Sequence, residues 1–127
     1  MAKVISLVNQ KGGVGKTTSV ANIGKAISMQ GKKVLLVDTD AQANLTSFFM
    51  DVNEERPTIC DAIVGGKKLD GIIMNIGENF DIVPSSILLA GAEAQISNQL
   101  AREWILAKLL KPIQDRYDII IIDCPPA

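Results

Sequence analysis

The chain has 127 residues, of which 47% are hydrophobic and only 4% aromatic, and its formal net charge is −1 at pH 7. This length suits one domain with a single aliphatic core, and the nearly balanced charge gives no electrostatic case for nucleic-acid binding by these residues. The chain contains no histidine, which excludes histidine-based acid–base catalysis and the usual zinc sites.

The first predicted element is a strand over residues 4–8, which is short, apolar and rich in β-branched side chains. It runs through a glycine-rich segment into a helix, whose apolar residues from Val20 to Ile27 recur at helical spacing and which Gly31 can end. A second apolar strand follows over residues 34–37. Together these elements predict a βαβ unit with a right-handed crossover.

The middle of the chain has weaker patterns. We expect a short helix over residues 58–64, brief strands over residues 72–76 and 80–83, and a helix that begins after Ser86. A further helix is expected over about residues 100–110. Its apolar stripe, which we expect to pack in the core, consists of Leu100, Trp104, Ile105, Ala107 and Leu109.

The last predicted strand, residues 119–122, ends at Asp123, just as the second strand ends at Asp38. Short apolar strands separated by helices predict an α/β fold with a mostly parallel, doubly wound sheet. Ligands of such folds bind outside the carboxyl ends of the strands. Because the sequence stops soon after it reaches this edge, we expect a part of a longer protein.

Other features set the expected environment of the protein. No apolar stretch approaches the roughly 20 residues that span a bilayer, and the N-terminus lacks a secretory pattern, so we expect a cytoplasmic protein. Cys60 and Cys124 lie far apart and outside any CxxC pair. They are therefore expected to be reduced, half-buried thiols.

The segment from Lys11 to Thr18, with the sequence KGGVGKTT, carries the strongest chemical signal. Glycines let backbone N–H groups close around phosphate oxygens, and the following helix directs the positive end of its dipole at the same anions. Lys16 supplies a charge for the β- and γ-phosphates, and the Thr17 hydroxyl suits Mg²⁺. The alternative is a tight strand-to-helix turn, but the Gly-Lys-Thr ending and both flanking elements favour a nucleoside triphosphate site. The expected phosphate-binding residues are Lys11, Gly12, Gly13, Val14, Gly15, Lys16, Thr17 and Thr18.

Three aspartates follow predicted strands at the expected binding edge. Asp40 is the candidate for positioning and polarising an attacking water, and Asp123 is the candidate for holding Mg²⁺ through a coordinated water. Asp38 is expected to be structural or to belong to the water shell of the metal, which makes it a possible metal ligand. The alternative for all three is a strand end with an Asx turn or a cap.

These segments resemble the ParA and MinD family of ATPases. Residues 11–18 are similar to the family's deviant Walker A motif, in which an extra lysine opens the loop and a usual glycine is missing, here at Gln10. Residues 38–42 are similar to switch I, except that Ala41 stands where many members have proline, and residues 119–126 are similar to the Walker B and switch II segment. Residues 81–86 and 89–93 are similar to the ParA/Soj partitioning branch.

The resemblance implies a P-loop fold of three αβα layers, with residues 1–127 as the N-terminal part of a single ATPase domain that uses ATP and Mg²⁺. It implies that ATP joins two subunits, that Lys11 reaches the phosphates of the partner, and that Lys16 serves its own ATP. It also implies that Thr17 holds Mg²⁺, that Thr18 contacts the α-phosphate and that Asp40 activates water. Slow hydrolysis would then separate the dimer.

For the whole protein, the resemblance implies chromosome or plasmid partitioning with a ParB-type activator. Nonspecific DNA binding would come from basic residues beyond this chain and would place the protein on the nucleoid. In the family topology, the first strand has a neighbour from sequence after Ala127. We therefore expect residues 1–127 alone to bind nucleotide weakly and to associate through the strand edge at residues 4–8.

Two alternatives to a partitioning ATPase stay open. One is a MinD-like ATPase that acts in division-site placement, which would need an amphipathic membrane helix outside these residues. The other is a module that folds or associates without competent nucleotide binding. A nitrogenase-reductase-like protein is disfavoured because Cys60 and Cys124 do not reproduce the cluster ligands of that family.

Overall fold

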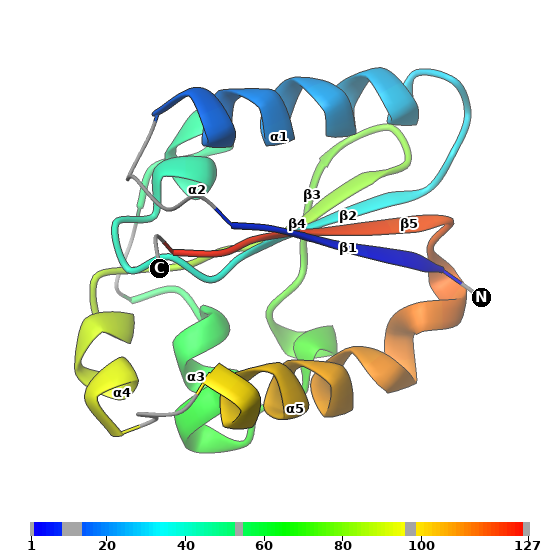
Figure 1. The fold of residues 1–127 in the computed structure, drawn as a ribbon. Helices are drawn as coiled ribbons and strands as arrows, with labels where there is room; N and C mark the ends of the chain where they lie inside the picture. Colours follow the sequence, from blue (N-terminus) through cyan, green and yellow to red (C-terminus); the bar gives the residue numbers. More distant parts are fainter. Residues whose placement is uncertain (1, 9–13, 53–54, 96–98, 126–127) are drawn as a thin grey trace.

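The computed structural model describes residues 2–8, 14–52, 55–95 and 99–125. Within these ranges, five strands form one sheet in the order β1-β5-β2-β4-β3 (Figure 1). The strands are β1 (Lys3–Leu7), β2 (Val34–Asp38), β3 (Met74–Gly77), β4 (Phe80–Val83) and β5 (Ile119–Asp123). All neighbouring pairs are parallel except β3 and β4, which form an antiparallel hairpin. The predicted α/β fold with a mostly parallel sheet is confirmed.

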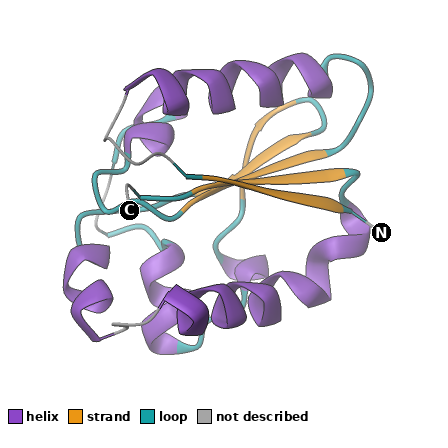
Figure 2. Ribbon diagram, viewed as in Figure 1, coloured by secondary structure: helices purple, strands orange, loops and turns teal. Residues whose placement is uncertain are grey.

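Helices cover both faces of the sheet and complete three layers (Figures 1 and 2). One face carries α1 (Val14–Ser28) and α2 (Asn44–Phe49). The other face carries α3 (Ile59–Gly65), α4 (Leu89–Gln95) and α5 (Gln99–Leu110). Two 3₁₀ helices, η1 (Leu69–Gly71) and η2 (Lys111–Arg116), join these elements to the strands. In the part of the chain that the structure describes, no helix has the length and apolarity needed to cross a membrane.

The central strands are buried on both faces, which explains their unbroken apolar sequences. In β2, Val34 and Leu36 pack into a core shared with α1 and α2. Leu35 and Val37 pack into a second core, shared with α3, α4 and α5. Because successive side chains of a strand point to opposite faces of the sheet, β2 contributes residues to both cores.

The expected helix over residues 58–64 is α3, and its sequence signals act as predicted. The side chain of Thr58 accepts a hydrogen bond from the backbone N–H of Cys60, and Asp61 Oδ2 accepts one from the N–H of Thr58 at 2.8 Å. This reciprocal arrangement is a capping box. Gly66 ends the helix at φ 70°, a left-handed conformation that glycine adopts without strain.

The prediction for the apolar stripe of α5 is wrong for its largest member. Trp104 is 63% exposed, and the buried face of α5 is formed by Leu106 and Leu110 instead. Apolar residues occur around most of this helix, so helical spacing alone selects the wrong face. Trp104 instead makes a cation–π contact outside the core, in which the ammonium group of Lys108 lies 4.3 Å from the ring centroid.

Two further elements differ from the predicted ones. Helix α2 has no predicted counterpart because it has six residues, and Ala43 at its N-cap position makes no side-chain cap and adopts φ 55°. The strand expected over residues 72–76 begins later, at Met74, because Ile72 is buried at the end of η1.

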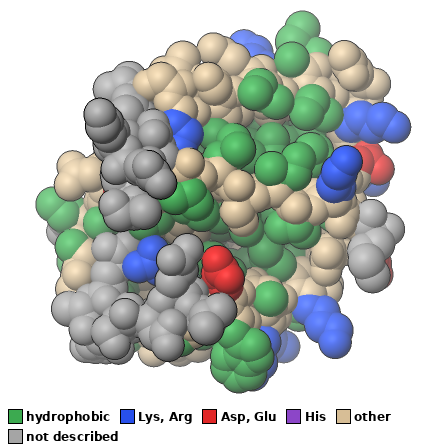
Figure 3. All heavy atoms as spheres, viewed as in Figure 1, with side chains coloured by type: hydrophobic (Ala, Val, Ile, Leu, Met, Phe, Trp, Pro, Cys, Tyr) green, Lys and Arg blue, Asp and Glu red, His purple; other side chains and the backbone are tan. Residues whose placement is uncertain are grey.

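Strand β1 lies at an edge of the sheet, since among the described strands it pairs only with β5. Val4 is 41% exposed, and Val8 just beyond the strand is 49% exposed. Figure 3, which has the same view as Figure 1, shows hydrophobic side chains at the surface between α1 and α5, where β1 lies. An exposed apolar edge of this kind is a template for pairing with another chain.

A preparation of residues 1–127 should therefore self-associate in a concentration-dependent way. A Val4→Lys variant should weaken this association by about tenfold or more, because a charged lysine on an edge strand opposes pairing. Sedimentation velocity across a concentration series measures the effect. Val64→Lys, on the exposed surface of α3, is the matched control. Equal association of the wild type and both variants would show that β1 is not the contact.

Candidate functional site

The candidate site lies where the carboxyl ends of β2 and β5 meet the first turns of α1. Asp38 and Asp123 are aligned partners at the ends of these two parallel strands. Helix α1 begins at Val14, so Gly15, Lys16 and Thr17 lie in its first turn. Lys11, Gly12 and Gly13 lie outside the described residues. The expected strand and helix, β1 and α1, thus lie before and after the part of this segment that is outside the described residues.

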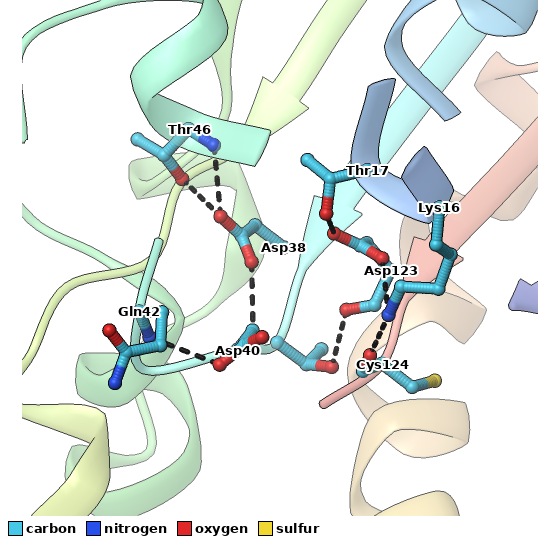
Figure 4. Close-up of polar contacts among 9 residues, drawn as sticks. Lys16, Thr17, Asp38, Asp40, Gln42, Thr46, Asp123 and Cys124 are labelled. Carbon is cyan, nitrogen blue, oxygen red and sulfur yellow. Dashed lines mark hydrogen bonds and ion pairs between the residues drawn. The ribbon is translucent and has the colours of Figure 1, made fainter. Parts of the chain in front are cut away.

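Lys16 and Thr17 both contact Asp123, from which they are more than 100 residues away in sequence (Figure 4). Lys16 Nζ lies 2.8 Å from Asp123 Oδ1 and also donates to the carbonyl oxygen of Cys124. Thr17 Oγ1 donates to Asp123 Oδ2 at 3.1 Å. Asp123 is almost completely buried, and a buried charge is costly unless it is paired. The ammonium group of Lys16 balances the negative charge of this carboxylate at short range. The structure therefore joins two of the segments that the sequence singles out.

This donor set fits Mg²⁺. The Thr17 hydroxyl and the Asp123 carboxylate are hard oxygen ligands, which Mg²⁺ prefers, and they lie within one hydrogen bond of each other. Within the described ranges, no group of three or more acidic, cysteine or histidine side chains could hold a metal ion. A Mg²⁺ ion held by this donor set would take its remaining ligands from water and from phosphate oxygens, as is usual for Mg²⁺ at nucleotide sites.

Asp38 is buried, and hydrogen bonds occupy both of its carboxylate oxygens. Oδ2 accepts from the backbone N–H of Thr46 at 2.9 Å and from Thr46 Oγ1 at 2.6 Å, while Oδ1 accepts from the N–H of Asp40 at 3.0 Å. Burial raises the pKa of Asp38 to about 6, and the hydrogen bonds from Thr46 and Asp40 oppose this shift. Both carboxylate oxygens of Asp38 thus have donors from the protein, and its role at the site stays a prediction.

Asp40 follows in the turn after β2 and is partly exposed. Its Oδ1 accepts from the backbone N–H of Gln42 at 3.1 Å (Figure 4), and its backbone carbonyl accepts from Ser85 Oγ at 2.8 Å. Asp38 and Asp40 thus both form Asx turns, which is the alternative that the sequence left open. The same turns separate the two carboxylates, so that Asp38 faces the protein interior while Asp40 keeps contact with solvent.

Three site residues have no counterpart among the predicted ones: Thr39, Thr46 and Ser85. Thr39 ties the loop to β5, because its N–H and its Oγ1 both donate to the carbonyl of Asp123, at 3.0 and 2.9 Å. Thr46 and Ser85 bind the two aspartates from α2 and from the end of β4. Thr39 and Ser85 lie within the segments 38–42 and 81–86 that the family resemblance singles out, but no pattern assigns them a role, and Thr46 lies outside these segments.

The buried carboxyl of Asp38 should make the stability of the fold depend on pH. Its pKa is raised, so the folded protein binds this proton more tightly than the unfolded chain does. The contribution is complete below about pH 3 and is lost as the pH rises through 6, a change of about 3 kcal/mol in all.

Urea unfolding of the wild type and of Asp38→Asn at several pH values tests this expectation. The stability of the wild type relative to the variant should fall by about 2 kcal/mol between pH 4 and pH 7. Asp51→Asn, which removes an exposed carboxylate, is the control. A constant difference between the wild type and Asp38→Asn across this range would contradict the assignment.

The chain is similar in sequence to one protein family and to proteins named Soj. Residues 2–127 match the family AAA_31, described as an AAA domain. The chain is 42% identical to the sporulation initiation inhibitor protein Soj of Bacillus subtilis, over 100% of this chain and 51% of that protein. It is 40% identical to the chromosome-partitioning ATPase Soj of Treponema pallidum, over 100% of this chain and 50% of that protein. The chain thus spans about half the length of these relatives.

A solved structure extends the likeness to three dimensions. Cobyrinic acid a,c-diamide synthase from Mycobacterium smegmatis, with a bound ATP analogue and magnesium, superimposes with a TM-score of 0.90 at 38% identity, over 100% of this chain and 52% of that one. The family match and these relatives confirm the resemblance seen in the motifs. The chain therefore belongs to the AAA domain family and is similar there to the chromosome-partitioning ATPase Soj.

Proposed function

We propose that the protein binds ATP with Mg²⁺ at this site, hydrolyses it slowly and uses the cycle as a dimerisation switch in chromosome or plasmid partitioning. The observation that carries the proposal is the convergence of Lys16 and Thr17 on the buried Asp123 at the carboxyl edge of the sheet. The ATP analogue and magnesium of the M. smegmatis protein and the partitioning role named for the T. pallidum relative support it.

In this proposal the residues of the loop bind the polyphosphate. Backbone N–H groups between Lys11 and Thr18 face the phosphate oxygens, and the dipole of α1 favours the same anions. Lys16 exchanges part of its contact with Asp123 for the β- and γ-phosphates, and Thr18 contacts the α-phosphate. Thr17 and Asp123 would hold Mg²⁺, Asp123 through water. When bound, the metal neutralises charge on the β- and γ-phosphates.

Asp40 is the proposed group that orients the attacking water. It is the carboxylate of this loop that keeps contact with solvent, and its backbone is held from both sides by hydrogen bonds. A carboxylate so placed can accept a proton from water or orient it toward a phosphorus atom. Asp38 supports this loop from the interior.

The wider function concerns the whole protein. We propose that residues 1–127 form the N-terminal part of a single ATPase domain, that ATP joins two copies, and that Lys11 of each copy neutralises charge on the phosphates of the other. A ParB-type activator and nonspecific DNA contacts outside these residues would complete a cytoplasmic, nucleoid-associated switch. The lengths of the relatives support a longer protein.

The role of Lys11 can be tested by light scattering on the protein at the full length that its gene encodes. Wild type should be a dimer with ATP and Mg²⁺ and a monomer with ADP. Lys11→Ala should abolish dimerisation and the hydrolysis linked to it while still binding ATP as a monomer, because a lysine acting across the interface is dispensable for the bound monomer. The exposed Lys32→Ala is the control. A Lys11→Ala variant that dimerises and turns over normally would refute the role.

A further inference from the structure

A closed circuit of hydrogen bonds lies behind Asp40 and joins three segments that are distant in sequence. Thr46 Oγ1 donates to Asp38 Oδ2 at 2.6 Å and accepts from the backbone N–H of Ser85 at 2.9 Å. Ser85 Oγ donates to the carbonyl of Asp40 at 2.8 Å, and the N–H of Asp40 donates to Asp38 Oδ1 at 3.0 Å. The circuit thus runs from Asp38 through Thr46 and Ser85 to Asp40 and back to Asp38.

We propose that Thr46 and Ser85 are positioning residues for Asp40, so that its carboxylate is set for hydrolysis. The Ser85 hydroxyl holds the Asp40 carbonyl directly, and the Thr46 hydroxyl holds Asp38, which accepts from the Asp40 N–H. This inference rests on the proposed function, because it assigns these residues to the same reaction.

Because the circuit is buried, the loss of any one of its hydrogen bonds should be costly. Asp38, Thr46 and Ser85 are each 1% exposed or less, so water does not replace a lost partner at low cost. The Thr46 hydroxyl uses its single donor and one acceptor position in the circuit. Valine has nearly the same shape but offers neither, so Thr46→Val would leave the N–H of Ser85 and part of Asp38 without their partners. Asp38 and Ser85, which hold the two sides of the Asp40 backbone, would then lose the hydroxyl that links them.

The arrangement also explains how the circuit acts on Asp40 and not on nucleotide binding. Its members hold the backbone around Asp40, whereas the side chains that contact the Asp123 carboxylate are Lys16 and Thr17 on α1. Thr39 ties the same loop to β5, but through the backbone carbonyl of Asp123. Figure 4 shows the two sets on opposite sides of the site, with Thr46 and Asp38 on one side and Lys16 and Thr17 on the other. A displaced Asp40 should therefore slow the chemical step and leave nucleotide affinity nearly unchanged. A misplacement of about 1 Å can cost about 100-fold in rate.

The test compares Thr46→Val, Thr46→Ser and Ser85→Ala with the wild type, all at the full length that the gene encodes. Steady-state ATPase assays give kcat and KM, calorimetry gives ATP affinity, and thermal unfolding reports folding. Thr46→Val should lower kcat by about tenfold or more with KM and affinity within about threefold. Thr46→Ser keeps the hydroxyl and should retain at least a third of the wild-type kcat. The adjacent, exposed Ser47→Ala, whose hydroxyl donates to the Asn44 carbonyl of its own helix, is the matched control and should behave as wild type.

The outcomes separate the inference from the proposed function. Wild type without any turnover contradicts the proposed function itself. Wild-type kcat in Thr46→Val, or an equal loss in Thr46→Ser, overturns the inference, since the second result would assign the effect to packing. If Thr46→Val does not fold, Ser85→Ala decides, because it removes only the hydroxyl on the Asp40 carbonyl. A several-fold lower kcat at unchanged KM in Ser85→Ala supports the inference, and a normal kcat refutes it.

Discussion

Replacing Asp40 with asparagine or alanine should lower kcat for ATP hydrolysis by about 10²–10⁴-fold, the usual contribution of a positioned acid–base group. ATP affinity should stay within a few fold, because Asp40 lies in the loop after β2 and not among the groups that contact Asp123. The ATP-bound dimer should therefore accumulate. Single-turnover assays on the full-length protein and light scattering with ATP and Mg²⁺ measure both effects.

The two substitutions separate a chemical role for Asp40 from a structural one. Asparagine keeps an oxygen that can accept from the N–H of Gln42, so the Asx turn survives, but it cannot take a proton. Alanine loses both properties. The exposed Asp51→Ala serves as the control. If Asp40→Asn turns over at the wild-type rate while Asp40→Ala does not, Asp40 shapes the loop and takes no part in proton transfer.

Replacing Lys16 with alanine should have the largest effect on nucleotide binding. A charge-assisted contact with phosphate contributes about 1.5–3 kcal/mol, so ATP affinity should fall by about ten- to a hundredfold. The same change removes the cation that lies 2.8 Å from the buried carboxylate of Asp123. Loss of one partner of a buried ion pair typically costs about 3–5 kcal/mol of stability, which sets an upper range for the destabilisation here.

These two effects of Lys16→Ala can be measured independently. Urea unfolding without nucleotide reports the lost pair with Asp123, and calorimetry at a temperature where the variant is folded reports ATP binding. Lys25→Ala changes an exposed lysine in the last turn of the same helix and should alter neither quantity. Wild-type affinity for ATP in a folded Lys16→Ala protein would remove this lysine from the binding site.

The sheet and the main contacts of the site could be predicted because short-range patterns determine them. Strands β2 and β5 are unbroken apolar runs that end in aspartate, and parallel strands bring their carboxyl ends to one edge. The segment from Lys11 to Thr18 follows the first strand and leads into α1. Topology then places Lys16 and Thr17 near Asp123, whereas the ion pair and the hydrogen bond between them are findings of the structure.

The circuit behind Asp40 could not be predicted, because it depends on register between strands. Val37 lies opposite Val83 in the sheet, and this pairing brings the residues after β2 next to Ser85 after β4. No local sequence pattern indicates that β2 and β4 pair in this register. Helix α2, which supplies Thr46, was also not predictable, since its six residues carry no N-cap side chain and the helix depends on packing of Leu45.

The exposed Trp104 shows the same limit for side-chain packing. Periodicity identifies α5 as a helix but not its orientation, which is fixed by the contacts of Leu106 and Leu110 with the core. A tryptophan is a large apolar residue and is therefore expected on the buried face of a helix. Here its ring is exposed to solvent and contacts the ammonium group of Lys108.

The most direct test of the central claim is calorimetric titration of ATP into the full-length protein, with Mg²⁺ and again with a chelator. The account predicts saturable heat with one nucleotide per chain, and clearly weaker binding when the metal is removed, because Thr17 and Asp123 would contribute their oxygens through Mg²⁺. The absence of binding heat under both conditions, from protein shown to be folded, would contradict it.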